Sequence, residues 1–361
     1  MTEQSLASGG KPWLLTGIGQ LPKIVVTAAA AYEDVFKTQF DVFVRGPGET
    51  VLEVLGEGIF NVDGDKWKHQ RRVTSHLFSM HMLKDCMNAV VREKTVKLRD
   101  VLAMCAERGD SVSMKSLLNK YTADTFTRIG FGVELNGLDE PVDVDTTQPL
   151  DAALRVVQTR LQSPVWLWKL RRKLATSDTP HRDLMTLMLQ SGDFTDAREI
   201  RDVAVNFYAA GKDTTAFSLS WFIVMMNRHP LVLCKIREEI RRVAPGLFVG
   251  ELDTPTLEQL QQMTYLEAAL KESLRLHSLA VYRLANRDTT MYDGTFVPKG
   301  ARVVFSMYGS ARQPTVWGAD AAEYRPERWI DEKTGKMKTI SSFQFVTFSA
   351  GPRQCIGMLW P

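Results

Sequence analysis

The sequence predicts a mainly α-helical protein with small β-sheets. Apolar residues recur at helical spacing over several long segments, whereas β-prone runs bounded by turn residues are few and short. With 361 residues, the chain is long enough to bury a large core. The segments with helical spacing are 80–135, 200–227, 230–242 and 263–277, and the β-prone segments are 22–28 and 293–308.

The composition is that of an ordinary globular protein, with 44% hydrophobic and 24% charged residues. A net charge of only +3 gives no argument for nucleic-acid binding, so no nucleic-acid partner is expected. The 4 cysteines are scattered without paired spacing, which argues against a disulfide framework or a zinc site and favours a reducing compartment. No run approaches the roughly 20 apolar residues of a membrane-spanning helix.

The chain begins with a segment that has no clear pattern. We expect residues 1–21 to form an N-terminal tail and residues 22–361 to form a single domain. Within this domain, 22–28 is predicted to be a strand, 30–40 a helix, and 51–60 a second short helix that ends in a glycine-rich turn.

The next helix carries a tryptophan and an arginine four positions apart. Asp65 is a plausible N-cap for it, and the spacing places Trp67 and Arg71 on one helix face. An indole N–H and a guanidinium side by side suit a buried carboxylate, and the alternative is a surface Trp–Arg stack. Other faces hold Lys66, Lys68 and Arg72, which are either a basic docking surface for an acidic partner or a solvated helix face.

A basic, tryptophan-bearing stretch lies further along the chain. Residues 164–174 combine apolar and basic side chains in an amphipathic pattern that suits a membrane surface. An ordinary surface helix explains the same pattern.

Residues 200–227 form the clearest long helix, and it is apolar on nearly all sides, which is typical of a helix through the core. Its centre contains Gly211, Asp213 and Thr214, each of them unfavourable inside a buried helix. Together they predict a functional kink, in which a threonine hydroxyl replaces a backbone hydrogen bond. The alternative is a tolerated polar patch.

Close to the end of the sequence, one cysteine lies in a loop of small residues, within the pattern Phe348, Gly351, Arg353, Cys355 and Gly357. Glycine lets the backbone approach a bound group closely. Backbone N–H groups and the nearby arginine favour the thiolate, which suits a single soft metal. As the axial ligand of haem iron, a thiolate favours O–O cleavage. The alternative is a buried, inert cysteine beside a turn.

This loop resembles the haem-binding loop of the cytochrome P-450 family, and four other motifs match that family in the same order from about residue 22 to 361. The resemblance therefore implies the cytochrome P-450 fold. The other motifs are Trp67-x-x-x-Arg71, the stretch 209–215 (AAGKDTT), Glu272-x-x-Arg275, and Arg328 within 324–329 (YRPERW).

The resemblance implies a role for each matching residue. Cys355 is the ligand of the iron of haem b (iron protoporphyrin IX), within a binding loop that includes Phe348, Gly351 and Gly357. The propionate partners implied are Trp67, Arg71 and Arg353. Asp213 and Thr214 are the acid–alcohol pair that delivers protons for O–O cleavage. A buried ion cluster that pins the Cys loop beneath the haem is formed by Glu272, Arg275 and Arg328.

The family's activity implies a haem-thiolate monooxygenase that inserts one oxygen atom of O2 into a C–H bond of a lipophilic substrate. Electrons come from NADPH through a reductase-type flavoprotein, and the family location is the cytosolic face of the endoplasmic reticulum membrane. Several short segments of the sequence are most similar to those of eukaryotic fatty-acid omega-hydroxylases. The resemblance therefore implies fatty acids as one substrate class.

The chain also departs from the family's pattern. A membrane anchor with its hinge, a long helix between Trp168 and Leu184, and the helix after the cysteine are not found. The family's prolines after the Glu-x-x-Arg helix are also missing from 276–288. We therefore expect a truncated fold and a cytoplasmic or peripheral location. The alternative function is a non-catalytic family remnant with weak or no haem binding.

Overall fold

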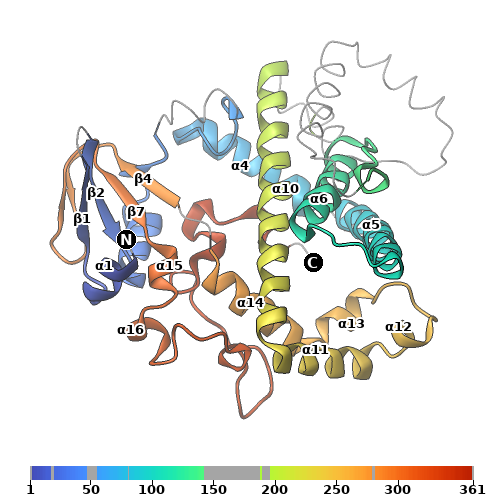
Figure 1. Ribbon diagram of the computed structural model, residues 1–361. Helices are drawn as coiled ribbons and strands as arrows, with labels where there is room; N and C mark the ends of the chain where they lie inside the picture. The colour runs from blue at the N-terminus through green and yellow to red at the C-terminus, as the bar shows by residue number, and fades with distance from the viewer. Residues whose placement is uncertain are drawn as a thin grey trace. The chain divides into compact units, whose positions relative to one another are not determined.

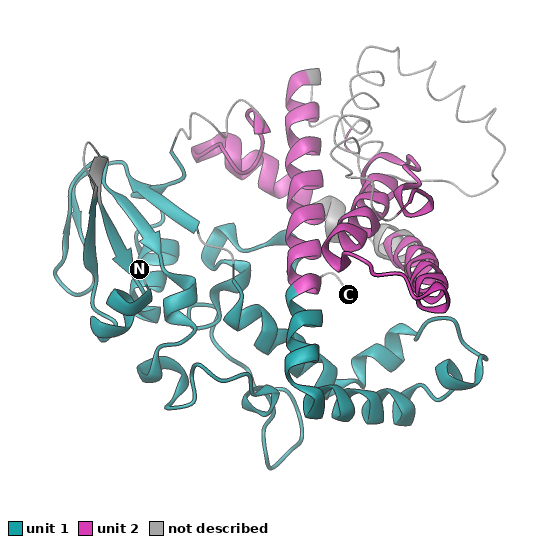
Figure 2. Cartoon of the chain, in the orientation of Figure 1, with its two compact units in different colours: residues 1–47, 221–359 teal, residues 48–220, 360–361 magenta. Residues whose placement is uncertain are grey.

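The computed structural model describes residues 2–17, 20–46, 55–79, 81–141, 188, 196–278 and 281–359. It confirms the predicted class, because most elements are helices and the sheets are small (Figure 1). The chain divides into two compact units (Figure 2): unit 1 holds residues 1–47 and 221–359, and unit 2 holds 48–220 with 360–361. The single domain expected for 22–361 stays a prediction.

The main sheet lies in unit 1 and has five strands in the order β1-β2-β7-β4-β3. Strands β2 and β7 are parallel, whereas the other pairs are antiparallel. The strand predicted over 22–28 is β2, and its Val25 is fully buried. The bounds are β1 Trp13–Gly17, β2 Gln20–Val26, β3 Phe43–Val44, β4 Val281–Ala285 and β7 Arg302–Phe305.

Two sequence predictions differ from this sheet. Residues 1–21, expected as a tail, contain α1 (Thr2–Ala7) and the edge strand β1. The hairpin predicted over 293–308 is wrong: its first turn joins β5 (Thr289–Thr290) to β6 (Phe296–Val297), while β7 joins the main sheet. Burial explains the difference, because Val303 and Phe305 of β7 are completely inaccessible within the larger core.

Short helices surround the sheet and the Cys loop in unit 1. Helix α14, which contains the Glu-x-x-Arg motif, contacts α11, and both contribute to one apolar cluster with Met225 and Tyr324. The helical elements are α2 Ala29–Glu33, the π-helical turn η1 Asp34–Thr38, α11 Pro230–Val243, α12 Gly246–Val249, α13 Leu257–Gln261, α14 Thr264–Leu276, α15 Met307–Ser310, α16 Pro314–Trp317, η3 Pro326–Trp329, η4 Val346–Phe348, η5 Gly351–Arg353 and η6 Ile356–Leu359.

Unit 2 is helical, and α5 contacts both α4 and α6. The Ser113 side chain accepts a hydrogen bond from the Ser116 N–H at the start of α6, and Gly132, with φ 63°, ends the helix. The bounds are α4 Gly64–Ser79, α5 His81–Arg108, α6 Met114–Phe131 and the short turn η2 Gly137–Asp139.

Helix α10 (Ala197–Arg228) is the long helix predicted over 200–227, and its residues up to Ser220 belong to unit 2. It is α-helical throughout and is drawn without a break in Figure 1, so the predicted kink is absent. The predictions for 164–174 and for residues 51–54 of the helix over 51–60 lie outside the described residues, whereas 56–60 form the expected turn. Within the described part of the chain, no helix combines the length and apolar character that crossing a membrane requires.

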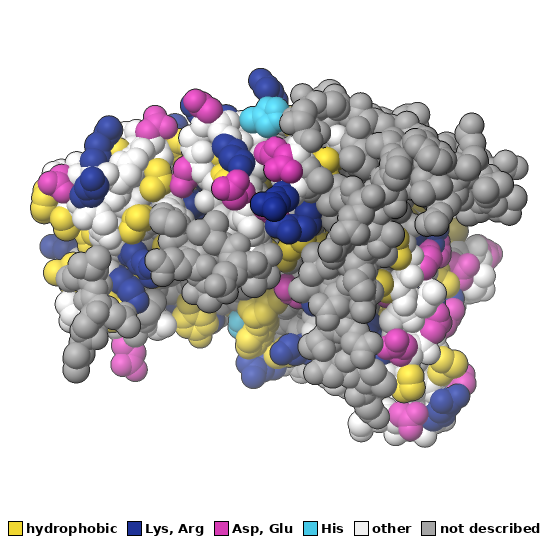
Figure 3. Space-filling model, turned by 90° about the horizontal axis from the view of Figure 1, so that it is seen from above, with side chains coloured by type: hydrophobic (Ala, Val, Ile, Leu, Met, Phe, Trp, Pro, Cys, Tyr) yellow, Lys and Arg dark blue, Asp and Glu magenta, His cyan; other side chains and the backbone are white. Residues whose placement is uncertain are grey.

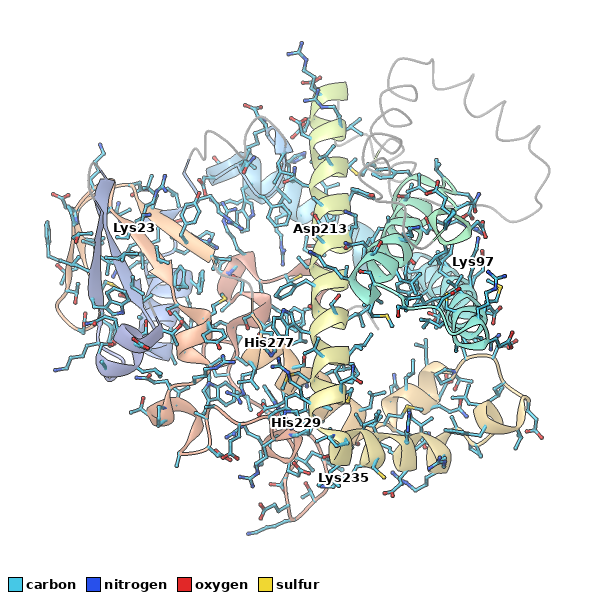
Figure 4. The ribbon with its side chains drawn as sticks, in the orientation of Figure 1. Lys23, Lys97, Asp213, His229, Lys235 and His277 are labelled. Atoms are coloured by element: carbon cyan, nitrogen blue, oxygen red, sulfur yellow. The ribbon has the colours of Figure 1, made fainter. Side chains whose placement is uncertain are left out.

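His277, labelled in Figure 4, follows α14, and its ring stacks on Trp221 with 3.8 Å between centroids. Burial, reinforced by the charges of Arg312 and Arg228, lowers the pKa of His277 to about 4. Between this value and an ordinary histidine pKa of about 6.5, the unfolded chain binds a proton that the folded chain does not. Stability is therefore expected to fall as the pH drops through this window.

Replacing His277→Phe retains a stacking ring and removes that titration. The free energy of unfolding in urea, measured at about pH 7.5 and about pH 5, should fall less on acidification in the variant than in the wild type. An equal fall in both proteins would show that His277 does not control this part of the pH dependence.

Candidate active site

The cysteine loop lies in unit 1 and presents an exposed thiol. Cys355 is exposed, and short helical turns stand on both sides of it, η5 before and η6 after. A β-carbon added to Gly357 would lie 3.8 Å from the Cys355 sulfur, in van der Waals contact with it. The glycine therefore keeps one side of the sulfur uncovered.

The backbone of this loop is held at two points. The Cys355 N–H donates to the carbonyl of Phe348 at 2.8 Å. Gly351 has φ 64° and packs against the Phe36 carbonyl, where an added β-carbon would come within 2.1 Å of the oxygen. Only glycine fits there, because any side chain would clash with backbone and would also disfavour this left-handed conformation.

Between these points the backbone is strained. Ser349 has φ 59° and ψ −172°, a combination that glycine adopts readily and other residues adopt at a cost of about 1–3 kcal/mol. A strained backbone conformation persists only where surrounding contacts hold it. The contacts on either side of Ser349 therefore determine the backbone path of the loop.

The other predicted loop residues lie against aromatic rings. The ring of Phe348 is half-buried and meets that of Phe345 edge-on, with centroids 6.1 Å apart. The guanidinium of Arg353 is partly exposed and lies 6.0 Å from the centre of the Phe40 ring. The cation therefore stays within the loop region, two positions before Cys355.

The structure brings Glu272, Arg275 and Arg328 together in unit 1. The Glu272 carboxylate is fully buried, and Arg275 binds it at both oxygens, at 2.7 and 2.8 Å. Arg328 Nε lies 3.3 Å from the same carboxylate. Two further donors are the Trp329 indole and the Arg325 backbone N–H, at 2.9 and 3.0 Å. The buried negative charge is thus fully paired and hydrogen-bonded.

Sequence reasoning missed two members of this cluster. Trp329 was only part of the quoted motif, and Asp320 was not considered. Asp320 accepts from Arg328 at 2.9 Å and from Arg325 at 2.7 Å, and these bonds lower the pKa of Asp320 to about 2. Because Trp329 also packs edge-on against Phe345 at 4.8 Å, the cluster reaches the residues that precede the cysteine.

Helix α4 of unit 2 carries the predicted Trp67 and Arg71. Trp67 is only 6% exposed, whereas Arg71 is partly exposed one turn later. The predicted N-cap Asp65 is wrong, because the helix begins at Gly64 and Asp65 lies in its first turn. There the carboxylate pairs with Lys68 at 3.2 Å.

Of the two interpretations of Lys66, Lys68 and Arg72 on α4, the structure favours a solvated helix face over a basic docking surface. Lys66 forms an ion pair with Glu57, and Lys68 pairs with Asp65. On the face shown in Figure 3, basic and acidic side chains are interspersed over the described residues. A mixed surface thus replaces the uniform basic patch.

A polar network that the sequence did not reveal ties α4 to α10 within unit 2. Gln70 donates to the Glu57 carbonyl at 3.0 Å and to the Glu199 carboxylate at 2.9 Å. Asp202 accepts from the Glu57 N–H at 2.8 Å, and Asn206 donates to the Leu55 carbonyl at 2.7 Å. These contacts fix the backbone that leads into α4. Three of the four join residues more than a hundred positions apart, so no local pattern indicates them.

The centre of α10 shows why its unusual residues are tolerated. A β-carbon at Gly211 would come within 2.1 Å of the Phe126 ring of α6, so glycine permits close packing there. Asp213, labelled in Figure 4, is exposed and pairs with Lys212 at 2.9 Å. The exposed Thr214 donates its hydroxyl hydrogen to the Ala210 carbonyl, a local bond that leaves the helix intact.

Comparison with known proteins identifies the family. The family model described as cytochrome P-450 matches residues 6–175 and 165–359. The chain belongs to the cytochrome P-450 family. Membership makes it a monooxygenase by class and implies a haem cofactor. It is a family-level result, and the residues that hold the haem in this chain remain a proposal.

Three relatives illustrate the similarity. Cytochrome P-450 CYP94D108 of Paris polyphylla is 32% identical over 371 residues, with 92% of this chain and 74% of the relative covered. Cytochrome P-450 94B1 of Arabidopsis thaliana is 30% identical, with 90% of this chain and 71% of the relative covered. Cytochrome P-450 monooxygenase cyp1 of Mycosarcoma maydis is 29% identical, with 96% and 61% covered.

The Cys355 loop fits a haem-thiolate ligand. The thiol is exposed, Gly357 leaves one side of its sulfur uncovered, and Arg353 supplies a nearby positive charge. A thiolate is the soft donor that such an iron site uses.

Breaking the buried ion cluster should destabilise unit 1. Glu272→Gln removes the charge that compensates Arg275 and Arg328, and we expect a loss of about 3–5 kcal/mol in the free energy of unfolding in urea. The control is Glu267→Gln on the same helix, whose carboxylate is half exposed and pairs with Lys271. It should cost less than about 1 kcal/mol, and equal losses in the two variants would contradict a special role for Glu272.

Proposed function

We propose that this cytochrome P-450 inserts one oxygen atom of O2 into a C–H bond of a lipophilic substrate, with haem b held by the Cys355 thiolate. The observation that carries the proposal is the exposed Cys355 thiol on a loop held by the Phe348 carbonyl and by the packing of Gly351 on Phe36. Such a loop presents a ligand in a defined position with little reorganisation.

The bound haem would supply the activation of dioxygen, and a thiolate ligand favours O–O cleavage. In this proposal Cys355 donates its sulfur to the iron, and Arg353 favours the charged form of that sulfur. Trp67 and Arg71, on one face of α4, would hold the propionates. Phe348 would pack near the thiolate.

Asp213 and Thr214 handle protons in this proposal. Asp213 is exposed, so its carboxyl group can exchange protons with solvent, and it forms an ion pair with Lys212 at 2.9 Å. The Thr214 hydroxyl donates to Ala210 within its own helix, which leaves its oxygen lone pairs available to accept a proton. The pair thus combines an acid that reloads from water with a hydroxyl in a fixed orientation.

The finer assignments rest on the resemblance in sequence. We propose fatty acids as a substrate class, NADPH through a reductase-type flavoprotein as the source of electrons, and a peripheral site at the endoplasmic reticulum membrane. The similarity of segments such as 56–72 (GEGIFNVDGDKWKHQRR) and 317–329 (WGADAAEYRPERW) to fatty-acid omega-hydroxylases supports the substrate class.

Cys355→Ala tests the iron ligand. The reduced wild-type protein with carbon monoxide should give a red-shifted, thiolate-type Soret band, and this variant should lose it because the sulfur is gone. Cys234→Ala, at another exposed cysteine of unit 1, should retain the band. A histidine-type band, or no haem in the wild type, would sink the proposal and support a non-catalytic remnant.

Thr214→Ala tests the proton path. The variant should bind haem normally but release oxygen as peroxide, with product per NADPH falling at least about tenfold because proton delivery is lost. The control is Ser218→Ala, one turn later, whose hydroxyl makes the same type of bond, to the Thr214 carbonyl at 2.8 Å. Unchanged coupling in Thr214→Ala, or equal uncoupling in both variants, would count against the role.

A further inference from the structure

The end of helix α14 is joined to the cysteine loop by two hydroxyl groups. Ser278 Oγ and Thr347 Oγ1 are 2.9 Å apart, and both lie close to the Leu274 carbonyl, at 2.7 and 3.1 Å. Leu274 belongs to the last turn of α14, where carbonyls lack a partner within the helix. The two hydroxyls therefore satisfy a helix end and connect it to a segment 73 positions away.

The neighbouring carbonyls of that last turn have partners of their own. The Ser273 carbonyl accepts from the His277 N–H at 3.0 Å, and the Leu276 carbonyl accepts from Arg312 Nη1 at 3.0 Å. The carbonyl of Leu274 is thus the point in this turn where the cysteine loop attaches. Two hydroxyls supply two hydrogens for four contacts, because Ser278 Oγ also lies 3.4 Å from the Arg275 carbonyl. Each proton arrangement links Thr347 to the helix, either directly or through Ser278.

Thr347 stands directly before the residue that holds the cysteine. The carbonyl of Phe348 accepts the Cys355 N–H at 2.8 Å, and the strained Ser349 follows. The bonds of Thr347 therefore hold one end of the strained segment in place. The packing of Gly351 against Phe36 holds the other end. The ring contacts from Trp329 through Phe345 to Phe348 orient side chains, whereas the Thr347 hydroxyl is a directional bond at the backbone turn itself.

We propose that Thr347 is a positioning residue for the haem-ligating Cys355, acting through its hydroxyl bonds to Ser278 and the Leu274 carbonyl. The assignment of Cys355 as ligand rests on the proposed function, and the tether itself does not. Ser278 lies in the segment that departs from the family by lacking prolines, and proline has no side-chain hydroxyl.

Thr347→Val tests the tether, because valine keeps the branched shape and removes the hydroxyl. We expect the share of thiolate-type Soret band in the reduced, carbon monoxide-bound protein to fall severalfold. Thr347→Ser should restore it, since serine retains the hydroxyl. Ser278→Ala should give a smaller loss, because Thr347 can still donate to the Leu274 carbonyl. A wild-type band in Thr347→Val would overturn the proposal.

Hydrogen exchange gives a second measurement that needs no haem. The amide of Cys355 is protected by its bond to Phe348, so in Thr347→Val the peptide 346–356 should exchange about fivefold faster or more, and Thr347→Ser should match the wild type. Thr95→Val is the matched control, since its hydroxyl bonds within α5 and to Tyr121 in unit 2. Unchanged exchange in Thr347→Val would overturn the tether even where no thiolate band forms.

Discussion

One buried carboxylate organises unit 1. Glu272 is completely inaccessible and receives five hydrogen bonds, from two arginine side chains, an indole and a backbone N–H. An isolated charge at such a position would cost several kcal/mol, so each donor is needed in its place. Since these donors come from α14 and from residues 325–329, satisfying the charge also fixes the path of the chain towards the cysteine loop.

Arg275 shows how far this constraint extends. Beyond Glu272, its guanidinium donates to the carbonyls of Ala321 and Glu323 at 2.8 and 3.1 Å, and also to that of Ala311. A planar, always charged group with five donors serves these separate segments at once, which lysine cannot do. The backbone between 311 and 323 therefore needs little regular structure of its own, and it contains only the single helical turn α16.

From the sequence we could predict the helical class and the approximate ends of α10. The grouping of Glu272, Arg275 and Arg328 was implied by the resemblance. The predictions were wrong where packing between segments far apart in the sequence determines the local structure. The centre of α10 was expected to kink because Gly211 is a poor helix former, but this glycine accommodates the Phe126 ring and the helix continues. Likewise β7 does not form the expected hairpin. It pairs instead with the parallel strand β2, 279 positions away at Lys23↔Arg302, and this pairing places it in the buried main sheet. Local propensity carries no information on such partners.

Two threonines, Thr214 of unit 2 and Thr347 of unit 1, show that the effect of a hydroxyl hydrogen bond depends on how far apart in the sequence its partners lie. Thr214 makes its bond to a carbonyl four positions earlier in its own helix, so the contact is local and holds nothing else in place. Its side chain stays exposed. Thr347 makes its bonds to a carbonyl and a hydroxyl about 70 positions away. Because a non-local bond restrains the relative position of two segments, the same hydroxyl acts there as a structural tether, held behind a strained turn. The two threonines differ in the sequence separation of their hydrogen-bond partners, not in residue type. A local motif therefore indicated Thr214 in the sequence, whereas no local pattern indicated Thr347.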